Sequence, residues 1–415
     1  MAGRARAGRP QSVLWVLAAT VVSGVSGYLV IWLVARSLGA ADYSVFGVFW
    51  SGLFLIVGIL FGIQQETTRS TADSVAHDID APVRSSMWVF AACAAIVVIL
   101  SVGVTAILWA PATLGVDNVG LVVQIALGAG GNAVVATISG VLAGAGLWRQ
   151  LAAIIAIDGV LRILSVGVVL GAGGDTASLA WAVILPYPIS LGLVFLFAGT
   201  SFQHFTKSGL AYRRLIANSA QTMLGASATA VIINGFPLLL AFFALATEKA
   251  ELGALILAIT ITRAPVLVPL MALQSYLITR FTVLASPWRL IGQALALICI
   301  VMAVLGAATL FWGTWAFASV IGADFALSTS ALVPLVVSSG FVGSLCVTGP
   351  ALLARGEHRS YAVGWVLASV VAVGMLFVPV SLEGRAALAL SLGPIVGLVF
   401  HLAALRSATR QGRRA

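Results

Sequence analysis

A single arginine inside a long apolar stretch is the first position where this sequence could do chemistry. Arg263 lies in the run TITRAPVLVPL, and Pro265 and Pro269 follow it. An ionised group at bilayer depth is costly and marks a functional site by default, and the planar guanidinium suits phosphate. Gln274 lies on nearly the same face of a helix. We therefore expect Arg263 and Gln274 to line a water-filled cavity on a kinked helix. The alternative is a structural arginine that binds backbone carbonyls.

A second candidate is a pair of opposite charges in another apolar stretch. Asp158 and Arg162 lie four residues apart, which places them on one helix face where they can neutralise each other. One interpretation is a structural ion pair that holds the helices together. The other is an ion-coupling carboxylate that changes partners during a transport cycle.

Carboxamide side chains form the third group of candidates. Asn218 and Gln221 lie in one apolar stretch, and Gln124 and Asn132 lie in another. Amides inside a membrane often bridge helices, but they can also bind a polar cargo. We include all four as candidate substrate-binding residues.

The composition fixes the class of protein that must position these residues. Of 415 residues, 61% are hydrophobic and 8% are charged, whereas a soluble domain has roughly 25% charged residues. Soluble enzymes and DNA-binding domains are therefore excluded. Phosphate-binding loops, paired carboxylates in aqueous segments and nucleophile–base motifs are not found, so we expect no enzymatic activity, no cofactor and no metal site.

The apolar stretches predict an all-α, polytopic membrane protein. About 20 apolar residues in a helix span a bilayer. Twelve transmembrane helices are expected, at 12–35, 44–65, 86–110, 118–147, 151–171, 178–199, 215–246, 251–281, 290–314, 328–354, 360–380 and 386–406.

The positions of the charges orient these helices, because Lys and Arg accumulate in cytoplasmic loops. With both termini in the cytoplasm, most of the 22 basic residues fall on the cytoplasmic side. Arg36, Lys249 and Arg385 fall on the outer side, and Arg162 and Arg263 lie within the membrane. The net charge of +9 is then an orientation signal rather than a nucleic-acid surface. We expect a multi-pass protein of the inner (plasma) membrane.

A weak internal repeat divides the chain into two halves. Short matches recur in the same order at nearly one offset, for example Gly115-Val116-Asp117 with Gly322-Ala323-Asp324 and Arg69 with Arg280. Each half contains six predicted helices, so both halves keep the same orientation. The prediction is two pseudo-symmetric six-helix bundles, 1–206 and 207–415.

One segment resembles a known family. The run ARSLGAADYSVFG at 35–47 resembles the first loop of the polysaccharide-biosynthesis flippases in the MOP (multidrug, oligosaccharidyl-lipid, polysaccharide) exporter superfamily, whose pattern is roughly ARxLGxxDYGxF. Ser44 stands where glycine is usual. Arg69 is similar to the arginine that closes the second helix of that family, and LARGEHR at 353–359 resembles its loop after the tenth helix.

This resemblance implies alternating access by two bundles, which would move a polyprenyl-diphosphate-linked oligosaccharide from the inner to the outer leaflet. Arg263 would then hold the diphosphate, while Gln274, Asn218 and Gln221 meet the sugar. The implied partners are the lipid-linked glycan, membrane lipids, and a glycan polymerase or glycosyltransferases. The lipid II flippases have more cavity charges and two extra helices, which argues against a peptidoglycan precursor as cargo.

Two other functions stay open at this point. A cation-coupled multidrug antiporter of the same plan would need a buried carboxylate in the N-terminal bundle, and Asp158 is one. A non-transporting scaffold of a glycan-assembly complex is the third possibility, although a scaffold has no need for the cost of Arg263 in the membrane.

Overall fold

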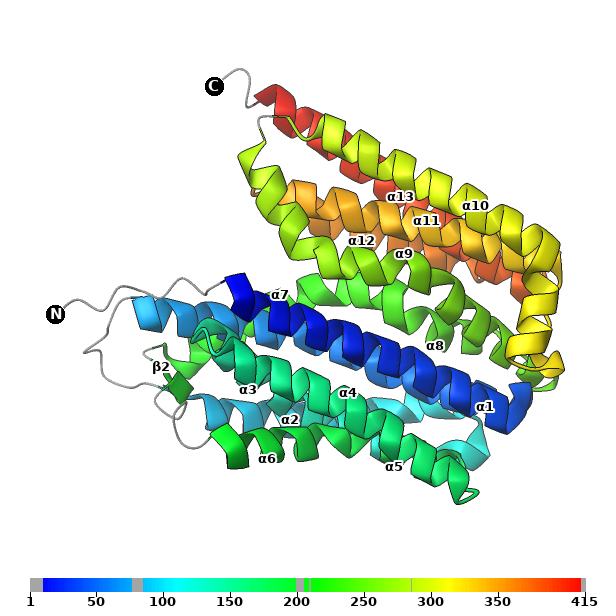
Figure 1. The fold of residues 1–415 in the computed structure, drawn as a ribbon, viewed down its shortest axis with the longest axis horizontal. Helices are drawn as coiled ribbons and strands as arrows, with labels where there is room; N and C mark the ends of the chain where they lie inside the picture. Colours follow the sequence, from blue (N-terminus) through cyan, green and yellow to red (C-terminus); the bar gives the residue numbers. More distant parts are fainter. Residues whose placement is uncertain (1–9, 77–84, 199–204, 209, 285, 412–415) are drawn as a thin grey trace. The chain divides into compact units, whose positions relative to one another are not determined.

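The computed structural model describes residues 10–76, 85–198, 205–208, 210–284 and 286–411 (Figure 1). Nearly all of them are helical. The helices are α1 Pro10–Ala76, α2 Met87–Thr113, α3 Leu121–Gly144, α4 Trp148–Gly171, α5 Thr176–Ile184, α6 Pro186–Ala198, α7 Tyr212–Ala230, α8 Phe236–Ala241, α9 Lys249–Val283, α10 Trp288–Val320, α11 Thr329–Leu353, α12 His358–Met375 and α13 Leu382–Gln411. Two short strands, β1 Ser85–Ser86 and β2 Lys207–Ser208, pair antiparallel.

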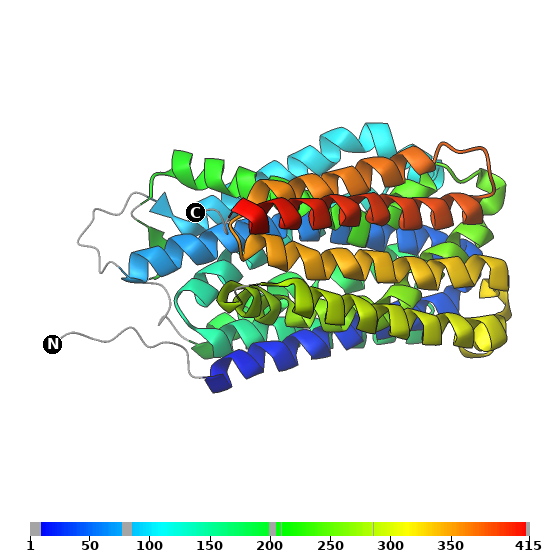
Figure 2. The same cartoon turned by 90° about the horizontal axis from the view of Figure 1, so that it is seen from above.

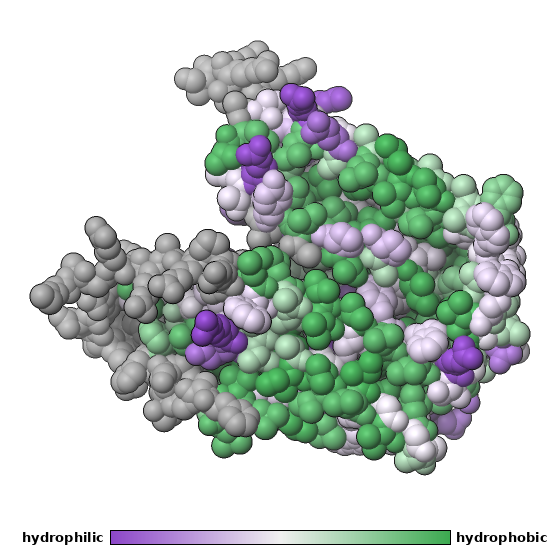
Figure 3. Space-filling model, in the orientation of Figure 1, coloured by the Kyte–Doolittle hydropathy of each residue, from purple (hydrophilic) through white to green (hydrophobic). Residues whose placement is uncertain are grey.

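The helices are those of a multi-pass membrane protein. In the described residues, ten helical stretches are long and apolar enough to cross a membrane, and the first of them, Leu14–Val75, covers two of the predicted spans. The helix α12 coincides with another predicted span but is not among the ten. The surface seen in Figure 3 is largely hydrophobic, with hydrophilic side chains in scattered patches. Lipid would cover such a surface without cost.

Three predicted boundaries differ from the structure, each for a local backbone reason. The loop expected at 36–43 is helical on both sides of a kink at Gly39, where φ is 75°. The expected span 178–199 breaks into α5 and α6 at Leu185. The expected span 215–246 is interrupted by a π-helical turn, Val231–Gly235, and α8 ends at Ala241. Pro186 and Pro237 follow the last two breaks, because proline has no N–H to continue the helix.

The predicted repeat has a structural counterpart at one pair of turns. Gly115 and Gly322 both have positive φ, 81° and 151°, a region that side chains other than glycine rarely occupy. Each is followed by a short 3-10 helix, Val116–Asn118 in the first half and Ala323–Phe325 in the second. The same three-residue pattern therefore folds in the same way twice.

The described chain divides into two compact units. Unit 1 comprises Met1–Val34 and Phe49–Ala230, and unit 2 comprises Ala35–Val48 and Val231–Ala415. The predicted halves were 1–206 and 207–415. In the structure, the segment 35–48 of the first half groups with unit 2, and the segment 207–230 of the second half groups with unit 1. The border at Ala230–Val231 coincides with the start of the π-helical turn.

Unit 1 is held together by interhelical packing around α3. The pairs α2–α3 and α4–α6 make its largest contacts. Its two apolar clusters centre on Leu60, Met87 and Val141, and on Ile138, Leu151 and Leu191. On the polar side, the Ser86 amide donates to the Tyr212 hydroxyl at 2.9 Å, which ties the strand pair to α7.

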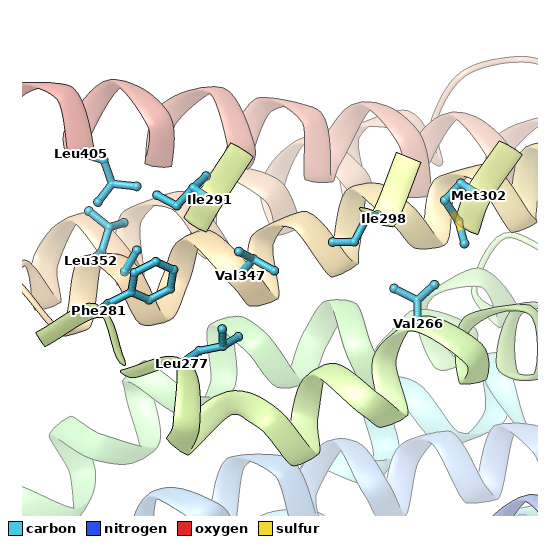
Figure 4. Packing of buried hydrophobic residues seen from close by; sticks show 10 residues of the cluster. Val266, Leu277, Phe281, Ile291, Ile298, Met302, Val347, Leu352 and Leu405 are labelled. Atoms are coloured by element: carbon cyan, nitrogen blue, oxygen red, sulfur yellow. The ribbon is translucent and has the colours of Figure 1, made fainter. Parts of the chain in front are cut away.

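Unit 2 is built around α11, whose interior face is almost completely buried. The helices α9 to α13 run side by side in both views (Figures 1 and 2). Figure 4 shows side chains from four of these helices meeting in one cluster, among them Phe281, Ile298 and Leu352. Because lipid tails are as apolar as these side chains, the cluster stabilises the unit through close packing between helices rather than through removal from water.

The family-like segment 35–48 is part of the packing of unit 2. Tyr43 is 1% exposed, and its ring meets Phe325 edge to face at 5.6 Å. Gly253 lies so close to the Ala40 carbonyl that a side chain would not fit there. Of the residues that carry the resemblance, Ala35, Tyr43 and Phe46 are therefore core residues, whereas Arg36 and Asp42 are exposed.

Two arginines that break the charge rule on the outer side have structural partners in unit 2. Arg36 donates to the carbonyl of Val320, the last residue of α10, at 2.9 Å. Arg385 donates to Val378 O and Phe243 O, each at 3.1 Å. The last carbonyls of a helix lack intrahelical donors and carry partial negative charge. Both side chains therefore stabilise helix ends.

Candidate polar sites within the two units

In unit 1, the structure brings Asp158 and Arg162 of α4 into an ion pair. Arg162 Nη2 donates to Asp158 Oδ2 at 2.5 Å, and the two side chains are 5% and 14% exposed. The guanidinium lies 5.2 Å from the ring centre of Tyr187 and 5.6 Å from that of Phe54. Cation–π contacts of this kind offset part of the cost of burying the charge.

Arg162 also lies at the break between α5 and α6. Pro186 has no N–H, so the carbonyl of Ala182 loses its helical donor. The Ser165 hydroxyl donates to that carbonyl at 2.7 Å, and Arg162 Nε donates to the neighbouring carbonyl of Val183 at 3.3 Å. The Ser165 hydroxyl of α4 thus replaces the hydrogen bond that Pro186 removes, and Arg162 adds a bond to the next carbonyl.

One oxygen of the ion pair keeps unused hydrogen-bonding capacity. Asp158 Oδ1 and the Tyr187 hydroxyl are both buried and have no hydrogen-bond partner among the described residues. A buried polar atom without a partner costs about 1–3 kcal/mol. Both atoms belong to residues that contact the same guanidinium, so their unused capacity is concentrated around Arg162.

In unit 2, Arg263 is buried at the π-helical turn. Its side chain is 3% exposed, and Nη1 lies 2.9 Å from Ile232 O and 3.5 Å from Ile233 O. A π-helix would satisfy Ile232 O from residue 237 and an α-helix would satisfy Ile233 O from the same residue. That residue is Pro237, which has no N–H. Arg263 therefore supplies the missing donor, and its guanidinium also lies 5.9 Å from the Phe236 ring centre.

The hydrogen bonds described for Arg263 are to backbone carbonyls, as expected of a structural arginine. A role in holding a diphosphate, with Gln274 on the same face, stays a prediction. Gln274 is partly exposed on α9, beyond the two prolines of that helix.

A polar site that the sequence analysis left out lies between α1 and α7 in unit 1. Glu66 is 2% exposed, and its carboxylate accepts three hydrogen bonds: Arg69 Nε at 2.9 Å, Arg69 Nη2 at 2.7 Å and Asn218 Nδ2 at 2.9 Å. The spacing of Glu66 and Arg69 on a helix was the available signal. We did not predict this contact, because both residues were expected at the cytoplasmic end of a span, where exposed charges are common.

The remaining predicted amides occupy different surroundings. Gln221 is exposed on α7, one turn beyond Asn218. Gln124 and Asn132 are buried in α3, and Gln124 Oε1 has no hydrogen-bond partner among the described residues. Of the four predicted amides in unit 1, Asn218 is the one for which the structure describes a hydrogen bond to a charged side chain, that of Glu66.

Comparison with known proteins finds relatives of the chain in mycobacteria. It is 32% identical over 412 residues to the uncharacterized protein Rv3630 of Mycobacterium tuberculosis (strain ATCC 25618 / H37Rv), which covers 95% of this chain and 92% of that protein. It is 33% identical over 410 residues to Rv1510 of the same strain, with 95% and 91% covered. The chain belongs to the family of Rv3630 and Rv1510. No protein-family model matches it.

The fold of this Rv3630-like chain is that of the MATE transporters. An inward-facing multidrug resistance MATE family transporter of the MOP superfamily aligns with a TM-score of 0.70 and 14% identity, over 95% of this chain and 96% of the other. A MOP superfamily transporter from Pyrococcus furiosus aligns with a TM-score of 0.64 and 12% identity, over 96% of each chain. The eukaryotic MATE transporter AtDTX14 also gives 0.64 and 12%, over 97% of this chain and 98% of the other. At these identities the likeness establishes the fold.

Proposed function

We propose that this protein is a membrane transporter that flips a polyprenyl-diphosphate-linked oligosaccharide from the inner to the outer leaflet. The observation that carries the proposal is the whole-length likeness to transporters of the MOP superfamily. Polar and charged groups buried in otherwise apolar helices support a path for a polar cargo.

The choice of cargo rests on the segment 35–47, which resembles the polysaccharide-biosynthesis flippases of that superfamily. The chemistry of unit 1 agrees with this choice. The face of α7 carries Asn218 and Gln221, and Arg69 lies beside it on α1. Amides and a guanidinium suit hydroxyls and phosphate better than they suit a cationic drug.

Leaflet exchange in proteoliposomes tests this function directly. The purified protein is reconstituted with a fluorescent polyprenyl-diphosphate oligosaccharide, and a membrane-impermeant reductant bleaches the outer leaflet. Bleaching of nearly all of the fluorescence is expected with the protein, and about half without it. A fluorescent phosphatidylcholine is the control and should stay half protected. Half protection of the glycan lipid in the presence of folded protein would contradict the proposal.

A cation-coupled multidrug antiporter is the second candidate, and Asp158 favours it. Asp158 has one oxygen that accepts from Arg162 and another that is buried without a partner. Such a carboxylate could take up a cation or proton on the second oxygen while the first keeps its bond to Arg162.

A pH gradient across the same proteoliposomes separates the two candidates. An antiporter would accumulate a fluorescent cationic dye when the gradient is imposed, and Asp158→Asn would abolish that accumulation. Dye accumulation that depends on Asp158, together with no flipping of the glycan lipid, would replace the first proposal with the second.

A further inference from the structure

We propose that Arg69 is the centre of a binding site for the phosphate group of a lipid, on the face of unit 1 formed by α1 and α7. The proposal deepens the flippase function and rests on it insofar as the phosphate belongs to the cargo. The site itself is argued from four features of unit 1.

The first feature is the way in which Arg69 is held. Glu66 is 2% exposed and bonds the guanidinium side-on through Nε and Nη2, at 2.9 and 2.7 Å. Asn218 fixes the same carboxylate from α7. A guanidinium held by a fork of this kind has already lost its rotamer freedom, so an incoming anion does not have to order it.

The second feature is the unused edge of Arg69. A guanidinium has five N–H donors, and two of them point to Glu66. The side chain is 58% exposed. The outer edge can therefore bind a phosphate with two parallel hydrogen bonds, the geometry for which arginine is suited.

The third feature is the charge around that edge. The bonds of Thr222 to Gly62 O and of Asn218 to Glu66 show that α1 and α7 pair antiparallel. Arg214, exposed and one turn before Asn218, therefore lies along α7 on the Arg69 side. It belongs to the first turn of α7, where the helix dipole favours an anion.

Two carboxylates oppose such an anion. Glu66 bonds the guanidinium on the side away from the open edge, and Asp73 lies one turn further along α1, where its charge also acts on Arg69. By Coulomb's law a carboxylate about twice as far from the anion as the guanidinium reduces the attraction of Arg69 by about half. Arg214 on α7 adds to the attraction and Asp73 subtracts from it.

The fourth feature is the contrast with the other arginines of the described chain. Arg36, Arg162, Arg263 and Arg385 all donate to backbone carbonyls at helix ends or breaks. At the corresponding place of unit 2, Arg280 is exposed, and the residue three positions earlier is Leu277 rather than a carboxylate. Arg280 is therefore a matched control for Arg69, because it has the same type and helix position without the buried anchor.

The test measures binding of farnesyl diphosphate to the full chain in phosphatidylcholine nanodiscs. Arg69→Gln should raise the Kd about tenfold or more, which corresponds to about 1.4 kcal/mol, and Arg280→Gln should stay within about twofold. Because Arg69→Gln leaves Glu66 charged and buried, the double variant E66Q/R69Q, which removes both charges, is measured beside it. Wild-type affinity in the double variant, or an equal loss in Arg280→Gln, would overturn the site.

Competition identifies the source of the phosphate. Adding phosphatidylglycerol to the nanodiscs should leave binding of farnesyl diphosphate unchanged if the site is selective for a prenyl diphosphate. Displacement that requires Arg69 supports the same site with a phospholipid headgroup as its ligand. If farnesyl diphosphate binds through Arg69 but the protein does not exchange the glycan lipid between leaflets, the flippase function is wrong and the site stands. If farnesyl diphosphate binds equally well without Arg69, the site is wrong and the flippase function is unaffected.

Discussion

Each compact unit buries one arginine at a helix that proline has interrupted, and the two differ in how the charge is balanced. Arg162 in unit 1 is 4% exposed and Arg263 in unit 2 is 3% exposed. Both donate to a backbone carbonyl in the turn before a proline, Arg162 to Val183 O before Pro186 and Arg263 to Ile232 O before Pro237. Arg162 additionally forms an ion pair with Asp158, whereas the bonds described for Arg263 are to carbonyls.

The type of partner, a carboxylate for Arg162 and backbone carbonyls for Arg263, determines whether the surroundings of a buried arginine can change charge. The carbonyl partners described for Arg263 carry partial charges that never titrate. A carboxylate can gain a proton or a cation, so the surroundings of Arg162 can change. The similar geometry of the two sites reflects helix repair, and their different chemistry makes unit 1 the place where coupling could occur.

Removing Arg162 should have the largest effect. Arg162→Leu leaves Asp158 buried without its partner, which costs about 3–5 kcal/mol. We expect a large loss of folded protein, measured by thermal unfolding in detergent. The double variant D158N/R162L removes both charges and should recover much of the stability. Equal instability of the single and double variants would show that helix repair, not charge balance, dominates at this site.

Removing Arg263 should cost less. Arg263→Met keeps a long side chain but removes the donor to Ile232 O, so the loss is about 1.5–3 kcal/mol, the value for a hydrogen bond from a charged group. The measurement is the same unfolding assay. A loss as large as that of Arg162→Leu would mean that Arg263 balances a charge as well as a carbonyl.

Restoring the missing backbone donor should make Arg263 less important. Pro237→Ala returns an N–H at residue 237, the donor that Ile232 O or Ile233 O lacks. In a double-mutant cycle, Arg263→Met should be at least about 0.5 kcal/mol less destabilising in the Pro237→Ala background. Pro237→Phe serves as a control that also returns the N–H, and simple additivity in both backgrounds would refute the repair role.

The smallest effect is expected at two helix N-caps outside the apolar spans. In unit 1, Asp175 accepts the Ser178 amide at 2.9 Å, and hydrogen bonds from Ser178 lower the pKa of this carboxyl. In unit 2, the Ser328 hydroxyl caps α11 in the same way. A lowered folded-state pKa means that the stabilisation is present above the unfolded pKa and is lost as pH falls through the folded pKa.

Unfolding midpoints measured from neutral to acidic pH test this difference. Asp175→Ser should slightly flatten the acid dependence, because a hydroxyl cap does not titrate, while Ser328→Asp should slightly steepen it. Identical pH profiles for Asp175→Ser and the wild type would show that this cap does not contribute to acid sensitivity.

Much of the fold could be predicted from hydropathy and charge, and the exceptions have physical causes. Apolar runs marked the helices because lipid demands them. The breaks at Leu185 and Val231 were not predicted, because proline within a long apolar run is compatible with either a kink or a break. Whether a kink or a break forms depends on whether a neighbouring side chain, here Ser165 or Arg263, can satisfy the released carbonyl.

The candidate site was harder to predict than the fold. The spacing of Asp158 and Arg162 was enough to expect their contact, because both lie on one helix. The contact of Glu66 with Asn218 joins residues 152 positions apart, and no periodicity in a single sequence can indicate such a distance. Likewise, Arg36 and Arg385 looked like exceptions to an orientation rule until their carbonyl partners were visible.

By itself, the sequence determined that this protein crosses a membrane many times, because 8% charged residues cannot cover a soluble protein of this size. It did not determine whether each proline kinks or breaks its helix. The tertiary structure decided what each buried charge does, since a charge in an apolar medium takes its role from whichever partner lies within hydrogen-bond distance. Arg263 next to Ile232 O completes a helix, and Arg69 next to Glu66 keeps one edge open.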